Sequence, residues 1–107
     1  MFSYRHAFHA GNHADVLKHL VVLGALTYLV TSKDTPLLLA DTHAGTGWYR
    51  LDGKQAHTSG EADAGVRKLW QLYAPTALQA DKATPLLHAY LAMLQRFNHG
   101  DALDSYP

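Results

Sequence analysis

The residues most able to do chemistry lie in a short stretch near the middle of the chain, from Asp41 to Gly47. The acid Asp41 follows the apolar run 37–40, and two glycines, Gly45 and Gly47, come shortly after it. This order predicts a buried parallel strand over 37–40, an acid at its carboxyl end and a glycine turn beyond it. In open α/β sheets ligands bind at this place, and glycine lets the backbone approach them closely. The stretch therefore predicts a site for a nucleotide-like ligand, with an ordinary turn after a strand as the alternative.

A second group of reactive side chains lies in the N-terminal residues 1–12, where neither a helical nor a strand period fits. The segment carries an aromatic ring, a guanidinium and imidazoles, at Tyr4, Arg5, His6 and His9. We expect an irregular arm that closes, together with Lys18 and His19 behind it, over a ligand at 41–47. The alternative is a terminal tail that its two phenylalanines hold in place.

The eight histidines raise the alternative of a metal site. The spacing His9-x3-His13 would place two imidazoles on one helical face, and zinc requires three or four such ligands. A helix start at Asn12 would separate the pair, however, and no acidic ligand completes the set. A His-rich metal-binding protein is therefore the less favoured hypothesis, and we assign no metal ligands.

Three helices must position these groups. The first is predicted over 13–31, with Asn12 as N-cap and a second half that is buried on most sides. The second is predicted over 60–74 and ends at Pro75. The third is predicted over 85–98, with Thr84 as N-cap and proline at its first position. The last two are predicted to pack as a pair through apolar faces at Val66, Leu69, Trp70, Tyr73, Leu87, Leu91, Leu94 and Phe97, with Tyr90 and Met93 beside them.

Composition sets further limits on function. The 107 residues are 48% hydrophobic and lack cysteine. The 9 basic residues balance the 9 acidic residues, so no net positive charge indicates a nucleic-acid partner. The N-terminus lacks a signal-peptide core. The apolar run 20–30 is about eleven residues long, against the roughly 20 that span a bilayer. We expect a cytoplasmic monomer without a membrane segment.

The predicted strand at 37–40 requires other strands and helices around it. A parallel strand this apolar needs neighbours at both edges and helices on both faces. The chain offers one more candidate strand, at 101–107. We therefore expect residues 1–107 to be the beginning of a longer protein.

Two sequence blocks carry a resemblance to a known family. These are Ser-Tyr-Arg-His-Ala-Phe-His-Ala-Gly-Asn-His-Ala-Asp-Val-Leu-Lys-His at 3–19 and Asp-Thr-His-Ala-Gly-Thr-Gly at 41–47. Together they closely resemble the RlmJ family, the adenine-N6 methyltransferases of 23S ribosomal RNA that use S-adenosylmethionine. The resemblance covers essentially all 107 residues, but only the first part of the family's full length.

The resemblance implies a fold and a domain organisation. The fold class would be α/β, the N-terminal fragment of a Rossmann-like methyltransferase with an inserted helical subdomain, mostly helical within this chain. Residues 1–49 would form the arm, the first helix, the first strand and the cofactor loop. Residues 50–100 would form the inserted helical subdomain, and 101–107 would begin the return to the methyltransferase core.

The resemblance also implies roles for particular residues. The arm would cover the cofactor, and 41–47 would bind its methionine end. The residues expected to bind S-adenosylmethionine are His19, His43, Asp41, Gly45, Gly47 and Lys18. The residues expected to contact the RNA substrate are Tyr4, Arg5 and His6.

One departure from the family pattern limits the prediction. The family's catalytic Asp-Pro-Pro-Tyr motif does not occur in this sequence, so the catalytic aspartate is expected beyond residue 107. The chain alone is then expected to be inactive, and a catalytically incomplete RNA-binding module is the main rival interpretation. A dinucleotide-binding dehydrogenase is less favoured because its fingerprint G-x-G-x-x-G is not completed after Gly47.

Overall fold

The computed structural model of the chain describes residues 5–52 and 60–107. Within these ranges, helices supply most of the regular structure and two short strands form one sheet. The elements in chain order are η1 (His6–Phe8), α1 (His13–Ser32), β1 (Tyr49–Arg50), α3 (Glu61–Ala64), α4 (Val66–Tyr73), η2 (Ala80–Lys82), α5 (Pro85–Asn98) and β2 (Ser105–Tyr106). The described part of the chain is therefore mostly helical, as predicted.

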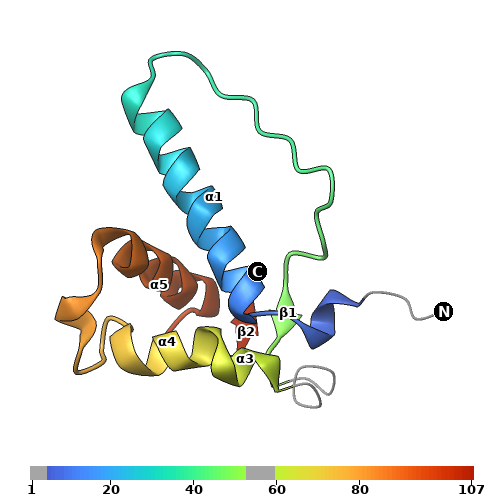
Figure 1. Cartoon of the computed structure of the whole chain (residues 1–107), viewed down its shortest axis with the longest axis vertical. Coiled ribbons are helices and arrows are strands. Elements are labelled where there is room, and N and C mark those ends of the chain that lie inside the picture. The colour runs from blue at the N-terminus through green and yellow to red at the C-terminus, as the bar shows by residue number, and fades with distance from the viewer. Residues whose placement is uncertain (1–4, 53–59) are drawn as a thin grey trace.

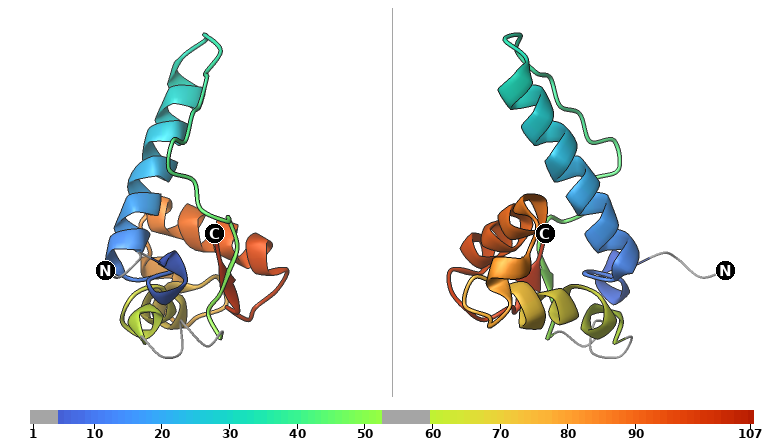
Figure 2. Two further views of the ribbon diagram at one scale, coloured as in Figure 1. Left: turned by 90° about the vertical axis from the view of Figure 1, so that its right-hand side faces the viewer. Right: turned by 60° about the vertical axis from the view of Figure 1, so that its left-hand side comes forward.

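Helix α1 begins where the sequence predicts and ends one residue later than predicted. The side chain of Asn12 accepts a hydrogen bond from the backbone N–H of Asp15 at 2.8 Å, which satisfies one of the unpaired donors of the first turn. The prediction that the second half of this helix is buried is wrong. Figures 1 and 2 show that half extending beyond α3, α4 and α5, and Val21, Tyr28 and Val30 are exposed.

The apolar character of α1 also has a consequence for membrane prediction. Among the described helices, α1 is long and apolar enough, by length and composition alone, to cross a membrane. Core helices of soluble proteins and signal sequences meet the same criteria. The sequence estimate of about eleven apolar residues counted a shorter run than the full helix, which has 20 residues.

The strand predicted over 37–40 does not form in this structure. Residues 36–41 have no regular secondary structure, and Leu38 is 93% exposed. The described residues place no other strand beside this segment, so its backbone groups find no ladder partners. The segment instead runs back from the end of α1 to β1 as an open loop (Figure 1).

The single helix predicted over 60–74 is divided into α3 and α4 at Gly65. A Cβ added at Gly65 would overlap the carbonyl oxygen of Gly11, so no larger side chain fits there. The break also frees the N–H of Val66, which donates to that same carbonyl at 2.8 Å. A contact with the N-terminal segment therefore decides where the helix divides.

Helix α5 is confirmed at both ends. Thr84 accepts a hydrogen bond from the backbone N–H of Leu87 at 3.2 Å, and Pro85 occupies the first helical position. The helix stops at His99, whose φ of 57° is left-handed. The predicted packing of the two helical segments is also confirmed, since α4 contacts α5 and both contribute buried residues to the core. Phe97, predicted on this face, is not among the core residues. The core contains Ala10, Val16, Leu51, Ala62, Val66, Tyr90, Leu91, Leu94, Leu103 and Tyr106.

The predicted strand near the end of the chain is confirmed as β2, but it lies beside β1 and not beside residues 37–40. It pairs antiparallel with β1, with Tyr49 opposite Tyr106 and Arg50 opposite Ser105. The side-chain oxygen of Asn98 accepts hydrogen bonds from the backbone N–H of Ser105 and from its hydroxyl, at 2.9 and 3.0 Å. This anchor fixes β2 against the end of α5.

Candidate functional site

A hollow of about 830 Å³ contains most of the reactive side chains that the sequence singles out. It lies between the N-terminal segment, the first half of α1, the loop 39–47, Tyr49 and Pro107. Its volume falls in the range of small-molecule sites, roughly 300–1,000 Å³. His6, Lys18 and His19 line it from one side, and the predicted loop lines it from the other.

The loop side of the hollow is held by short local contacts. The backbone N–H of His43 donates to Asp41 Oδ1 at 3.0 Å, which forms a small turn closed by the aspartate side chain. Gly47 has a φ of 76°, a left-handed value that favours glycine, and a Cβ at Gly45 would overlap the Tyr49 hydroxyl. Backbone conformation therefore favours glycine at position 47, and at position 45 a larger residue would displace the Tyr49 hydroxyl.

His19 lies on the opposite side of the hollow and is half-buried. Its Nδ1 is 2.8 Å from the hydroxyl of Tyr106, and the two rings are 5.2 Å apart. Burial lowers the pKa of His19, and the charges of Lys18 and His6 lower it further, while Asp15 acts in the opposite direction. At neutral pH His19 is therefore an uncharged imidazole that can accept or donate a hydrogen bond.

Two buried tyrosines support His19 from the core. The hydroxyl of Tyr106 is hydrogen-bonded to that of Tyr90, and neither residue is exposed. Burial raises the pKa of both hydroxyls, so both stay protonated near neutral pH. The sequence predicted Tyr90 as a core residue, whereas the contact of Tyr106 with His19 joins residues 87 positions apart and was not predicted.

Asp15 was missed as a site residue because the sequence reading used it only as a favourable charge at a helix start. It is 2% exposed, and its Oδ2 lies 2.9 Å from His6 Nε2. Its Oδ1 lies 3.3 Å from Lys18 Nζ and 4.0 Å from His19 Nδ1. We refer to these four side chains as the Asp15 cluster. The spacing i, i+3 and i+4 from Asp15 to Lys18 and His19 is the signal that could have revealed it.

The residues predicted to contact RNA are only partly described. Tyr4 lies outside the described residues. Arg5 is exposed, and His6 contacts Asp15 and meets the Tyr49 ring edge-on, with centroids 4.9 Å apart. The structure brings His6 to the hollow, beside the residues predicted to bind the cofactor.

The histidines pair with carboxylates on different elements. His9 Nδ1 lies 2.6 Å from Glu61 Oε2, whereas His6 pairs with Asp15. In the described ranges, no group of three or more His, Asp or Glu side chains has an arrangement that could hold a metal ion, the Asp15 cluster included. His13 belongs to α1 while His9 precedes it, so the two do not share one helical face.

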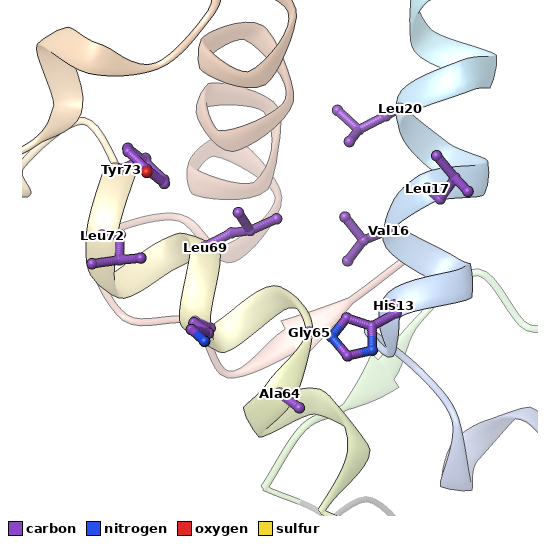
Figure 3. A pocket seen from close by; sticks show the side chains of 10 residues that line it. His13, Val16, Leu17, Leu20, Ala64, Gly65, Leu69, Leu72 and Tyr73 are labelled. Atoms are coloured by element: carbon purple, nitrogen blue, oxygen red, sulfur yellow. The ribbon is translucent and has the colours of Figure 1, made fainter.

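A second hollow, of about 480 Å³, lies between α1 and α4 (Figure 3). Apolar side chains form most of it, among them Val16, Leu20 and Leu69. Lys68 and His13 also line it, and no carboxylate does. It therefore lacks the paired acidic and basic groups that the larger hollow contains.

The chain is similar to known proteins over most of its length. A family described as "Ribosomal RNA large subunit methyltransferase D, RlmJ" matches residues 34–107, which include the loop side of the hollow. The chain belongs to the RlmJ family. The RlmJ resemblance stated from the two sequence blocks is thereby confirmed.

Individual RlmJ relatives extend the match to the N-terminal segment. The chain is 42% identical over 107 residues to "Ribosomal RNA large subunit methyltransferase J" of Escherichia coli (strain K12), covering 100% of the chain and 35% of that relative. The protein of the same name from Haemophilus influenzae is 41% identical over 100 residues, covering 94% of the chain and 32% of that relative. The chain thus spans about a third of the length of these RlmJ proteins.

A solved structure is similar as well. The crystal structure of a Legionella pneumophila protein assigned to the family DUF519 matches with a TM-score of 0.72 and 33% sequence identity, covering 92% of this chain and 32% of that one. These comparisons favour neither a metal-binding protein nor an RNA-binding module without catalysis.

Proposed function

We propose that this chain supplies the N-terminal part of an enzyme that methylates the N6 amine of an adenine in 23S ribosomal RNA, using S-adenosylmethionine. Two relatives are named as ribosomal RNA large subunit methyltransferases. The observation that carries the proposal is the larger hollow. It brings Lys18 and His19 of α1 to the loop 41–47, as a cofactor site built from both sequence blocks requires.

The side chains of the hollow fit the methionine end of the proposed cofactor. That end carries a carboxylate and an ammonium group, and when bound the cofactor supplies a methyl group on a cationic sulfonium. Lys18 and His19 are suited to donate to the carboxylate, and Asp41 is suited to pair with the ammonium. Gly45 and Gly47 would let the loop backbone approach, and His43 would contact the cofactor from the same loop.

The N-terminal segment is suited to hold the RNA base. An exocyclic adenine amine is a poor nucleophile because its lone pair is delocalised into the ring. The base must therefore be taken out of its stack and held in line with the methyl group. We assign this contact to Tyr4, with Arg5 and His6 beside it, because aromatic rings stack on unpaired bases and guanidinium groups bind phosphates.

We further propose that the chain is completed by a Rossmann-like core. Residues 37–40 would become a central strand once flanking strands supply ladder partners. The exposed apolar half of α1 would then be covered by the core rather than by a membrane. Residues 1–49 would belong to that core, 50–100 would form the inserted helical subdomain, and 101–107 would lead back. We assign the protein to the cytoplasm as a monomer.

Catalysis needs a group that this sequence does not contain. The Asp-Pro-Pro-Tyr motif expected from the family does not occur in residues 1–107, so the aspartate that the resemblance assigns to the amine proton is not among these residues. We therefore propose that this chain alone does not transfer methyl groups.

Calorimetric titration with S-adenosylmethionine tests the proposal. We would titrate this chain beside a chimera in which it is followed by the remaining two thirds of the Escherichia coli relative. Binding and RNA methylation by the chimera, abolished by His19→Ala and retained in the exposed control His88→Ala, would support the proposal. Binding by neither protein would contradict the assignment of the hollow, and methylation by the 107-residue chain would contradict the need for a missing acid.

A further inference from the structure

The buried carboxylate of Asp15 has no role in the cofactor and RNA assignments given above. Asp15 is in the first turn of α1 and is 2% exposed. Its Oδ2 accepts a hydrogen bond from the backbone N–H of Gly11 at 3.0 Å and lies 2.9 Å from His6 Nε2. A buried carboxylate is costly unless hydrogen bonds and cations compensate it, so these contacts hold the N-terminal segment against α1.

The second oxygen of the same carboxylate faces the cationic side of the hollow. Within the described ranges, Asp15 Oδ1 is buried and has no hydrogen-bond partner. The nearest cation is Lys18 Nζ at 3.3 Å, and His19 Nδ1 lies at 4.0 Å. Asp15, Lys18 and His19 all line the larger hollow, so this oxygen lies where a bound molecule would meet both side chains.

Contacts from two directions fix how His19 presents its ring. Its Nδ1 is held by the Tyr106 hydroxyl at 2.8 Å, which leaves Nε2 as the nitrogen for a molecule in the hollow. The negative charge of Asp15 lies one helical turn back on the same helix. The charged and titratable groups that act on His19 are Asp15, Lys18 and His6, with the hydroxyl of Tyr106 in direct contact.

We propose that Asp15 is a positioning residue that joins the N-terminal segment to α1 and directs Lys18 and His19 toward the loop 41–47. One carboxylate thereby couples the segment expected over the RNA base to the two side chains expected on the cofactor. The proposal rests on the proposed function for the identity of the bound molecule. The coupling itself is a property of the described contacts and can be measured separately.

The variant Asp15→Asn tests the proposal in the 107-residue chain. The amide is isosteric and can still accept from the Gly11 N–H, but it removes the negative charge beside His6, Lys18 and His19. Asp81→Asn, at an exposed carboxylate on η2, is the matched control. Affinity for S-adenosylmethionine is measured by calorimetry, and the titration of His19 is followed by NMR.

The proposal predicts two coupled changes in Asp15→Asn and none in the control. Affinity falls by about tenfold, the size expected when one charge-assisted contact is misplaced. The pKa of His19 falls further, because Asp15 is the group that raises it. Unchanged affinity in Asp15→Asn together with an unchanged His19 titration overturns the proposal. Loss of affinity with an unmoved His19 titration also overturns it, because it indicates a general loss of structure.

The remaining outcomes separate this proposal from the proposed function. If the unaltered chain does not bind S-adenosylmethionine, the cofactor assignment for the chain fails, and the His19 titration alone decides the role of Asp15. If Asp15→Asn does not fold, NMR of the Asp15 carboxylate in the unaltered chain tests the proposal instead. The Asp15 Cγ resonance then moves as His6 and His19 titrate if the carboxylate joins them, and its independence of both titrations overturns the proposal.

Discussion

Residues 60–106 supply most of the buried core, although Leu72, Leu78 and Leu86 are exposed there. Residues 21–48 contribute no buried core residue and leave many large apolar side chains exposed. Val66, Leu91 and Leu94 have no exposed surface, while Leu38 is 93% exposed. The first region finds partners within the described chain, since α4, α5, β2 and the start of α1 contact one another. The second carries the glycine loop but meets few packing partners. The difference teaches that the glycine loop lies outside the packed region, whereas the site residues of α1 lie at its edge, where His19 contacts the core residue Tyr106.

The largest effect that tests this comparison is expected from a substitution in the core. Leu91→Ala should lower the free energy of unfolding by about 2–5 kcal/mol, because it leaves a cavity in fully buried surroundings. Leu38→Ala, which makes the same change in the exposed loop, should alter it by less than about 0.5 kcal/mol. Urea denaturation followed by circular dichroism measures both, and equal effects would refute the division into a packed and an unpacked region.

A smaller effect is expected where the N-terminal segment meets α3 and α4. Gly65→Ala should lower the free energy of unfolding by about 1–3 kcal/mol, since the added Cβ overlaps the carbonyl oxygen of Gly11. Gly100→Ala is the control, because a Cβ there meets nothing within 4 Å. Thermal denaturation of the two variants should separate them, and a neutral Gly65→Ala would mean that the segment is not fixed at this point.

The hydroxyl of Tyr106 joins the packed region to the hollow, so its removal sharpens the comparison. Tyr106→Phe should lower the free energy of unfolding by about 1–2 kcal/mol, because Tyr90 and His19 each lose a hydrogen-bond partner. Tyr28→Phe on the exposed part of α1 is the control. NMR should also show a changed environment at His19 Nδ1, and an unaltered His19 signal would contradict the contact.

The smallest effect expected is on the pH dependence of stability. Burial lowers the pKa of His19 below 6.5, so as pH falls below 6.5 the unfolded chain binds a proton more readily than the folded chain. His19 therefore makes the chain less stable as pH falls through this range. Denaturation curves measured between about pH 5 and 7 should show that the free energy of unfolding depends less on pH in His19→Gln than in the unaltered chain or in His88→Gln. An identical pH dependence of stability in all three proteins would contradict a lowered pKa of His19 in the folded chain.

Local sequence determined the helix boundaries of α1 and α5. Asn12 and Thr84 cap these helices through hydrogen bonds to residues three positions ahead, so the contacts that set the ends are short-range. The conformational need for glycine at position 47 is likewise local. The residue types predicted a ligand site at 41–47 closed by the N-terminal segment with Lys18 and His19, and the resemblance added the cofactor and RNA roles. The structure brings His19, Lys18 and His6 together with the loop 41–47.

Only the tertiary structure decided the features that depend on distant partners. Residues 37–40 have a strand-like sequence, yet a strand forms only when neighbours satisfy its backbone groups. The break at Gly65 depends on Gly11, and the contact between His19 and Tyr106 joins residues 87 positions apart. Within the Asp15 cluster, the spacing to Lys18 and His19 is local, but the burial of Asp15 and its contact with His6 depend on tertiary structure. The sequence places an acid in the first turn of a helix, but folding the N-terminal segment against that turn is what buries the charge and gives it partners.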